Sequence, residues 1–200
     1  MLTPDLTEAL DTAWRLLERG AKDRRSPVHT PAIASITPAG LPDQRTMVLR
    51  AASREAATLR FHTDARSPKC AALDAGAVHV LAYHPGQSLQ LRLSGTAEVI
   101  TQGPLIEQAW SASTRFARRC YMAQAAPGSP LAAPGSGLPA HVEGQEPNDA
   151  DLVEARANFA LLLVHVGQID WLHLAHTGHR RAGFNRDAAS GAWSGEWRLP

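Results

Sequence analysis

The chain has 200 residues, which is enough for one domain with a sizeable hydrophobic core. Its formal net charge of +1 gives no overall attraction to nucleic acid or to an anionic membrane, so we expect neither as a partner. The two cysteines, Cys70 and Cys120, are too few for a disulfide framework, and we expect both to be reduced thiols. Residues 1–10 lack the basic and apolar regions of a secretory signal, and the longest apolar run, residues 159–166, has the length of a strand. The sequence therefore predicts a soluble, cytoplasmic protein.

An amphipathic helix is predicted over residues 3–20. Thr3 can cap its N-terminus, Pro4 suits the first helical position, and Gly20 suits its C-terminal end. The apolar residues that recur on one face are Leu6, Leu10, Trp14 and Leu17. This pattern predicts that the helix packs against the rest of the domain.

From about residue 31 the apolar pattern changes to the alternation that is typical of strands. The elements predicted here are strands at 31–40, 43–53 and 56–63, a short helix at 67–76, and a hairpin-like strand pair at 77–100 that is interrupted at 84–87. In the short helix Ser67 is the cap, Pro68 takes the first position, and Gly76 follows the end.

The second half of the chain is predicted to be helical first and then to end in strands. The elements are a helix at 104–123, a loop at 125–148, a helix at 149–160, and strands at 161–176, 179–187 and 192–200. The loop holds five Pro and four Gly, a density typical of irregular structure. Successive strands without βαβ alternation predict one domain, residues 1–200, with the insertion loop at 125–148. Its fold class is mainly β with peripheral helices, as an antiparallel barrel or strongly curled sheet.

Polar and basic side chains are concentrated where the strand at 56–63 gives way to the short helix. Thr63 and Ser67 supply hydroxyl groups, Lys69 supplies a positive charge, and Arg66 supplies a guanidinium. A lysine at a helix N-terminus opposes the helix dipole unless an anion is bound there. The turn is interpreted as a phosphate site; the alternative is an ordinary capped helix with solvated basic side chains.

A second cationic feature is the pair Arg45 and Arg50, which flank one apolar strand segment. Because strand residues alternate between faces, one of the two is expected to point toward a core or a cavity. A buried arginine needs an anionic or polar partner, such as a ligand phosphate. The alternative is that both lie at strand ends and extend into solvent.

In sequence order, these motifs resemble the core of the pyridoxamine 5′-phosphate oxidase family of FMN-binding split barrels. The shared features are the arginine-flanked strand at 45–50, the strand that ends in Thr63, the Ser-x-Lys helix start, and the Gln-apolar-Arg-apolar-x-Gly-x-Ala-Glu strand at 90–98. Residues 169–187 and 192–200 resemble that family's closing strands. The resemblance implies an antiparallel FMN-binding split barrel and a relative of the vitamin B6 oxidase rather than that enzyme itself.

The resemblance also implies a set of cofactor contacts in a homodimer with the flavin at the subunit interface. The residues that would line the flavin and its ribityl chain are Arg45, Thr46, Met47, Val48, Leu49 and Arg50. Those that would hold or adjoin the FMN phosphate are His62, Thr63, Ser67 and Lys69. Gln90 would hydrogen-bond the flavin, and Trp171 and Arg181 would come from the partner subunit. His62 and His84 have an alternative role as turn caps.

The chain departs from the family's oxidases in the region that would bind substrate. Thr177 stands where those oxidases carry the first arginine of an Arg-x-His-x-Arg-like set, and their substrate-phosphate cluster has no clean counterpart in residues 110–121. His179 and Arg50 are therefore the candidate contacts to a small-molecule substrate of unknown identity. We expect an FMN-dependent oxidoreductase, without an assigned catalytic side chain; the alternative is a non-catalytic flavin- or haem-binding module.

A metal site is not expected. His173, His176 and His179 are spaced three apart, but on a strand adjacent members of this set point to opposite faces.

Overall fold

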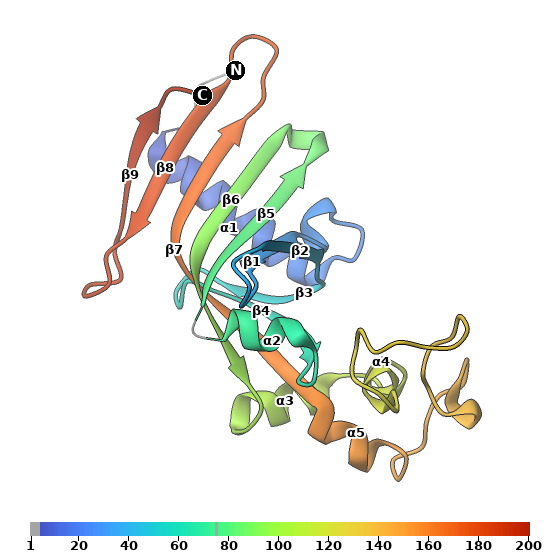
Figure 1. Cartoon of the computed structure of the whole chain (residues 1–200). Helices are drawn as coiled ribbons and strands as arrows, with labels where there is room; N and C mark the ends of the chain where they lie inside the picture. Colours follow the sequence, from blue (N-terminus) through green and yellow to red (C-terminus); the bar gives the residue numbers. More distant parts are fainter. Residues whose placement is uncertain (1–4, 75) are drawn as a thin grey trace.

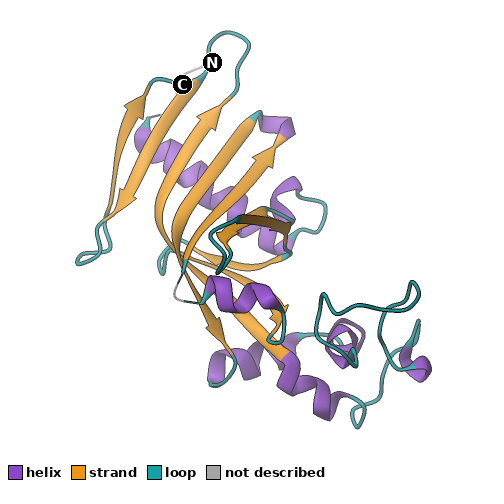
Figure 2. Cartoon of the chain, viewed as in Figure 1, coloured by secondary structure: helices purple, strands orange, loops and turns teal. Residues whose placement is uncertain are grey.

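The computed structural model of the chain describes residues 5–74 and 76–200 (Figure 1 and Figure 2). In this part of the chain, nine strands form one antiparallel sheet in the order β2-β1-β5-β6-β7-β4-β3, which β8 and β9 extend from β7. The sheet is strongly curled and not closed, and helices lie around it (Figure 2). This confirms the predicted fold class.

The elements have the following bounds. The strands are β1 (Ala32–Ile36), β2 (Pro42–Thr46), β3 (Leu49–Ser53), β4 (Thr58–Asp64), β5 (Ala77–His84), β6 (Leu89–Ile100), β7 (Phe159–His173), β8 (Arg180–Arg186) and β9 (Trp193–Arg198). The α-helices are α1 (Leu6–Lys22), α2 (Pro68–Leu73), α3 (Pro104–Ala112), α4 (Arg115–Arg118) and α5 (Leu152–Asn158). The short 3-10 helices are η1 (Pro27–His29), η2 (Pro85–Gln87), η3 (Arg119–Met122) and η4 (Ala140–Val142).

Helix α1 differs from its prediction at both ends. Asp5 caps it by accepting a hydrogen bond from the backbone N–H of Glu8 at 2.7 Å, while the predicted Thr3 and Pro4 lie outside the described residues. The expected end at Gly20 is wrong, because the helix continues to Lys22. Gly20 instead provides space: a Cβ there would lie 2.6 Å from a methyl carbon of Val28.

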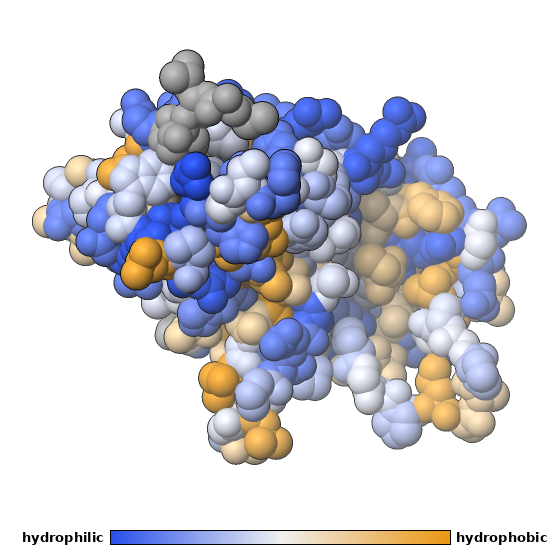
Figure 3. All heavy atoms as spheres, turned by 90° about the horizontal axis from the view of Figure 1, so that it is seen from above, coloured by the Kyte–Doolittle hydropathy of each residue, from blue (hydrophilic) through white to orange (hydrophobic). Residues whose placement is uncertain are grey.

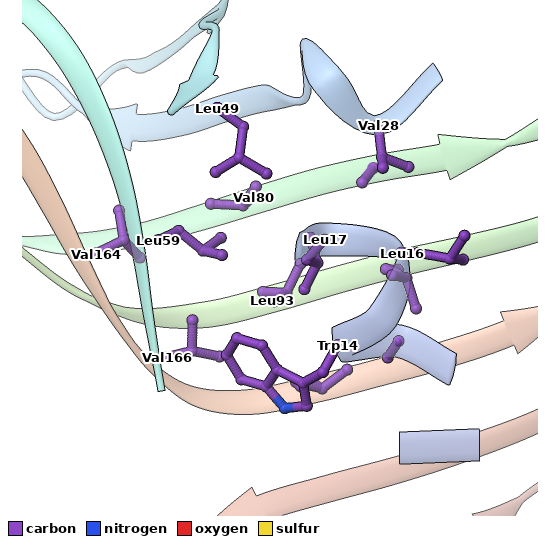
Figure 4. Close-up of a cluster of buried hydrophobic side chains, with 14 of the residues drawn as sticks. Trp14, Leu16, Leu17, Val28, Leu49, Leu59, Val80, Leu93, Val164 and Val166 are labelled. Carbon is purple, nitrogen blue, oxygen red and sulfur yellow. The ribbon is translucent and has the colours of Figure 1, made fainter. Parts of the chain in front are cut away.

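The main core lies between α1 and the curled sheet. Figure 1 shows α1 behind β5 to β8, and Figure 4 shows Trp14 and Leu17 of α1 facing Leu93 and Val166 of the sheet. All four side chains are buried. The predicted apolar face of the helix therefore packs as its sequence pattern indicates.

A second, smaller core lies at the other end of β7 and is formed with residues of α3, η3 and α5. Figure 1 shows α3 and α5 beside this end of the strand. Its central aromatic residue is Phe159, whose ring centroid lies 5.0 Å from that of Tyr121 and 5.2 Å from that of Trp110. The stretch 125–148 contains one short element, η4. Seen from above in Figure 3, the surface is mostly hydrophilic, with hydrophobic side chains in small separate groups. None of the helices in the described part of the chain combines the length and the hydropathy that crossing a membrane requires.

The predicted strand at 43–53 is in fact two strands. β2 ends at Thr46 and pairs with β1, whereas β3 begins at Leu49 and pairs with β4. Between them, the backbone N–H of Met47 donates to the carbonyl of Pro31. The single-strand prediction is wrong because alternation of apolar residues does not reveal where a chain changes its pairing partner.

The strand β7 joins the two ends of the molecule. It pairs with β6 along nearly its whole length, with β4 through residues 159–165, and with β8 through residues 168–173. The register with β6 shifts at Ser94 and Gly95, and a Cβ at Gly95 would lie 1.9 Å from the carbonyl oxygen of His165. Only glycine permits this close approach of the two backbones.

We predict that Gly95→Ala destabilises the protein by about 3 kcal/mol, because the new methyl group forces β6 and β7 apart. For a chain of this size, that corresponds to a loss of roughly 6–12 °C in Tm. Gly86→Ala is the matched control, since a Cβ at Gly86 meets its nearest neighbour at an ordinary 3.4 Å. Equal Tm values for the two variants would contradict the steric role of Gly95.

Candidate functional site

The predicted phosphate turn lies between β4 and α2, with Ser67 as the helix cap. The side chains of Thr63 and Ser67 are buried, and the ammonium of Lys69 donates a hydrogen bond to the Ser67 hydroxyl at 2.9 Å. Burial lowers the pKa of Lys69, and the positive charge of Arg45 lowers it further against opposing effects of Cys70 and Asp64. Because α2 has only six residues, these side chains rather than a helix dipole favour an anion here.

Arg66 does not take part in this turn as an open anion-binding group. Its Nε and Nη2 donate to the carboxylate of Asp64 at 3.0 and 2.7 Å, and its Nη1 donates to the carbonyl of Ala123 at 2.9 Å. The suggestion that Arg66 offers a fork to a phosphate is therefore wrong. Its partner Asp64 was overlooked, although the two residues are close in the sequence.

Arg45 brings β2 close to the same turn. It shares its face of the sheet with the buried cross-strand neighbours Ile33 and Val80, and its side chain is 17% exposed. The guanidinium donates to the Ser35 hydroxyl at 2.9 Å and forms an ion pair with Asp43. Of the two arginines flanking this segment, Arg45 is thus the one that points inward, and protein groups satisfy it.

The residues that follow Arg45 differ in how far their side chains are buried. Thr46 is exposed and Val48 is half-buried, whereas the side chains of Met47 and Leu49 belong to the hydrophobic core. Arg50 is exposed, at the step where the register between β3 and β4 shifts. It therefore lies apart from Arg45 and faces a separate cavity.

This cavity, here called the basic cavity, has a volume of about 310 Å³ and lies between α1 and η1, the β3–β4 pair, and α3 and α4. The basic side chains that line it are Lys22, Arg24, His29, Arg50, Arg60 and His62. Among the described residues, no carboxylate lines it. Buried Nε of Arg60 and Nε2 of His62 have no hydrogen-bond partner within the chain. Positive groups without counter-charges make this a favourable place for an anion.

His62 is held neutral in this cavity. Burial, followed by the charges of Arg50 and Arg60, lowers its pKa to about 4. Its ring packs edge-on against Phe159 with centroids 4.9 Å apart. Sequence reasoning selected His62 and Arg50 but missed Arg60, although residues 60 and 62 share one face of the predicted strand.

The other predicted flavin contacts lie near the far end of β7. Gln90 and Arg181 are both cross-strand partners of Leu172, so these three residues share one face of the sheet. Trp171 points to the opposite face, where it is 4% exposed and packs in the main core. The structure therefore separates Trp171 from Arg181, and Leu172 is the residue of β7 that lies beside Arg181 on its face.

One chain does not bring all of these groups together. Thr63 pairs with Ala160, and Trp171 follows Ala160 by eleven residues along β7. Eleven residues correspond to about 36 Å measured along the strand. His179 lies exposed in the loop between β7 and β8, and no trio of potential metal ligands meets within residues 5–74 and 76–200.

Residues 11–101 match a family model described as the FMN-binding domain of pyridoxamine 5′-phosphate oxidase. This chain is a relative of the pyridoxamine 5′-phosphate oxidase-like family. The matched segment includes the phosphate turn, both flanking arginines and Gln90, but it ends before β7. A comparison with curated protein sequences found no match.

Several solved structures share the fold of this chain. A pyridoxamine 5′-phosphate oxidase-related, FMN-binding protein from Nostoc punctiforme PCC 73102 has a TM-score of 0.72 at 23% identity, with 100% of both chains covered. PhzG from Burkholderia lata 383, solved with tetrahydrophenazine-1-carboxylic acid, has a TM-score of 0.74 at 17% identity, covering 100% of this chain and 98% of that one. A general stress protein 26-related protein from Clostridium acetobutylicum has a TM-score of 0.53 at 11% identity, with coverages of 86% and 92%.

We predict that His62 makes stability depend on pH. Between its folded pKa of about 4 and its ordinary value of 6.5, the unfolded chain binds a proton that the folded chain does not. The free energy of unfolding therefore falls as the pH is lowered through this window, by at most about 3 kcal/mol, and is unaffected by this group above it.

Urea unfolding of the wild type and of His62→Phe at several pH values measures this effect. The stability difference between the two proteins is expected to shift against the wild type from about pH 7 to about pH 4. His179→Phe, in an exposed loop, serves as the control. A pH-independent difference between wild type and His62→Phe would show that His62 titrates normally.

Proposed function

We propose that the protein is an FMN-binding flavoprotein that acts as a homodimeric, FMN-dependent oxidoreductase on a small anionic substrate. The observation that carries the proposal is the phosphate turn, where the Lys69 ammonium donates a hydrogen bond to the Ser67 hydroxyl and burial lowers the pKa of Lys69. The match of this segment to an FMN-binding domain family supports FMN as the anion. The whole chain, residues 1–200, acts as one domain with the loop at 125–148 inserted.

The side chains of the phosphate turn suit a phosphate group. Ser67 and Thr63 provide buried hydroxyls, Lys69 provides the charge, and Arg45 adds positive potential from β2. A bound dianion would stabilise the protonated form of Lys69, whose pKa burial now lowers. When bound, FMN supplies the redox chemistry by accepting electrons from one substrate and delivering them to another.

Two subunits are needed to complete this site. The phosphate turn and the face that carries Gln90 and Arg181 lie toward opposite ends of β7 in one chain, so a second copy has to supply one of them. The same sheet face exposes Leu81 by 44% and Tyr83 by 45%, two large side chains suited to burial against a partner. In such a dimer, Leu172 would offer an apolar surface between Gln90 and Arg181.

The basic cavity is the proposed place for the anionic group of the substrate. It adjoins His62, whose neighbour Thr63 belongs to the phosphate turn, and it contains Arg50 and the unpaired Nε of Arg60. Neutral His62 can accept or donate one hydrogen bond there without adding charge. Two unpaired cysteines favour a reducing compartment, which agrees with a cytoplasmic location.

We predict that Ser67→Ala combined with Lys69→Ala weakens FMN binding by about a hundredfold or more, because two contacts to a charged phosphate are lost. The measurement is the visible absorption of the purified protein, followed by titration of the stripped protein with FMN. Thr12→Ala with Arg15→Ala is the matched control, since it removes a hydroxyl–guanidinium hydrogen bond of 2.7 Å on the exposed side of α1. A double variant that stays as yellow as the parent would overturn the phosphate assignment.

We also predict that inorganic phosphate binds in the basic cavity and raises the pKa of His62 from about 4 toward 6.5. The measurement is an NMR titration of the His62 ring with and without phosphate. Replacing both Arg50 and Arg60 with Met is expected to abolish the phosphate effect. An identical His62 titration in the presence of phosphate would argue against an anion site here.

Turnover separates an oxidoreductase from a non-catalytic flavin-binding module. Anaerobic addition of reduced nicotinamide or of pyridoxamine phosphate is expected to bleach the flavin, and oxygen is expected to restore its colour. A protein that binds FMN and is bleached by neither would be a binding module rather than an enzyme acting on these donors.

A further inference from the structure

Arginines from two strands, β6 and β8, donate hydrogen bonds to one carboxylate of β7, on the sheet face that carries Gln90. Asp170 of β7 accepts from Nε of Arg181 at 3.2 and 3.1 Å and from its Nη2 at 2.6 Å. It also accepts from Nη2 of Arg92, on the opposite neighbour strand, at 2.6 Å. The carboxylate is 18% exposed, so solvent screens these contacts only in part.

The charges around Asp170 support an ionised carboxylate. Burial alone would raise its pKa, but hydrogen bonds from Arg181 and Arg92 outweigh this effect and hold the pKa below its usual value. The hydrogen bond to Asp170, together with the charge of this carboxylate, raises the pKa of Arg181. Asp170 thus remains charged at neutral pH and keeps both guanidiniums in place.

The network leaves one part of Arg181 available. Its Nε and Nη2 are both used by Asp170, whereas its Nη1 makes no hydrogen bond within the described chain. A guanidinium that is held at two nitrogens can turn only with loss of both contacts. Nη1 therefore projects from a fixed position on the face that also carries Gln90.

Among the described residues, Asp170 is the carboxylate that forms an ion pair with Arg181. Gly183 lies directly across from Asp170 on β8, and a Cβ there would collide with the guanidinium of Arg198. Arg198 donates instead to Glu196, at 2.8 and 3.0 Å. Asp170 is therefore the group in this part of the chain that orients Arg181.

We propose that Asp170 is a positioning residue that holds Arg181 so that one N–H of its guanidinium is aimed at the flavin carried by the other subunit. The inference rests on the proposed function, because it takes the sheet face with Gln90 and Arg181 as one wall of the FMN site. Asp170 also partly offsets the local excess of positive charge beside the flavin. It has no contact of its own with substrate or cofactor.

The test is Asp170→Asn, which keeps the shape of the side chain and removes its charge. We expect FMN affinity to fall by about tenfold, because Arg181 has to be ordered on binding. We expect the reduction potential of the bound flavin to become more positive, because a negative charge near it is lost. FMN titration by fluorescence quenching and anaerobic reduction against a reference dye measure these two quantities.

Matched variants distinguish positioning from a purely structural role. Glu196→Gln removes a carboxylate from the same sheet face without touching Arg181, and it is expected to change neither quantity. Asp170→Glu is expected to recover part of the affinity and the wild-type potential. If Asp170→Asn lowers Tm but leaves affinity and potential at wild-type values, the ion pair only stabilises the fold and the inference fails. A wild-type protein that binds no FMN would instead overturn the proposed function itself.

Discussion

The continuous pairing of β7 is the constraint on which the rest of the structure depends. Its fifteen residues run from the small core around Phe159 to the loop before β8, and β6 follows it through a bulge at Gly95. Because β4 and β8 occupy the same edge of β7 at different heights, the sheet divides instead of closing into a barrel. The phosphate turn is fixed at the β4 end, and Arg181 is fixed at the β8 end.

The phosphate turn and Arg181 thus lie at opposite ends of β7, and each holds ordered polar groups. At one end, the half-buried Lys69 donates a hydrogen bond to the buried Ser67. At the other end, Asp170 orders Arg181 on a sheet face that also exposes Leu81 and Tyr83. In the proposed homodimer, each FMN site would take its phosphate contacts from one subunit and its ring contacts from the other.

The distribution of charge follows the same division. The basic cavity collects cations from α1, η1, β3 and β4 without a carboxylate among the described residues, whereas Arg45 and Arg181 each have an aspartate partner. Arginines with such a partner are held in one orientation by its hydrogen bonds. The unpartnered groups, Arg60 and His62 among them, are the ones whose free energy a ligand anion would lower.

Local features could be predicted from the sequence because they depend on near neighbours. Ser67 and Pro68 are residue types that favour a helix start, and α2 begins there; the alternating pattern likewise indicated most strands. The order of the motifs along the chain also indicated the family whose model matches residues 11–101. The partner of Arg66 was missed although it is local, because a carboxylate two residues away can equally point into solvent.

Features that depend on register and on long-range packing were decided only by the tertiary structure. Apolar alternation looks the same whether a segment is one strand or two, so the break after Thr46 became visible only through its pairing with β1. The family resemblance placed Trp171 and Arg181 together, but their faces follow from the register of β7 with β8. The basic cavity could not be predicted from the sequence, because its residues are far apart in the chain. Only the packing of several elements places them around one space.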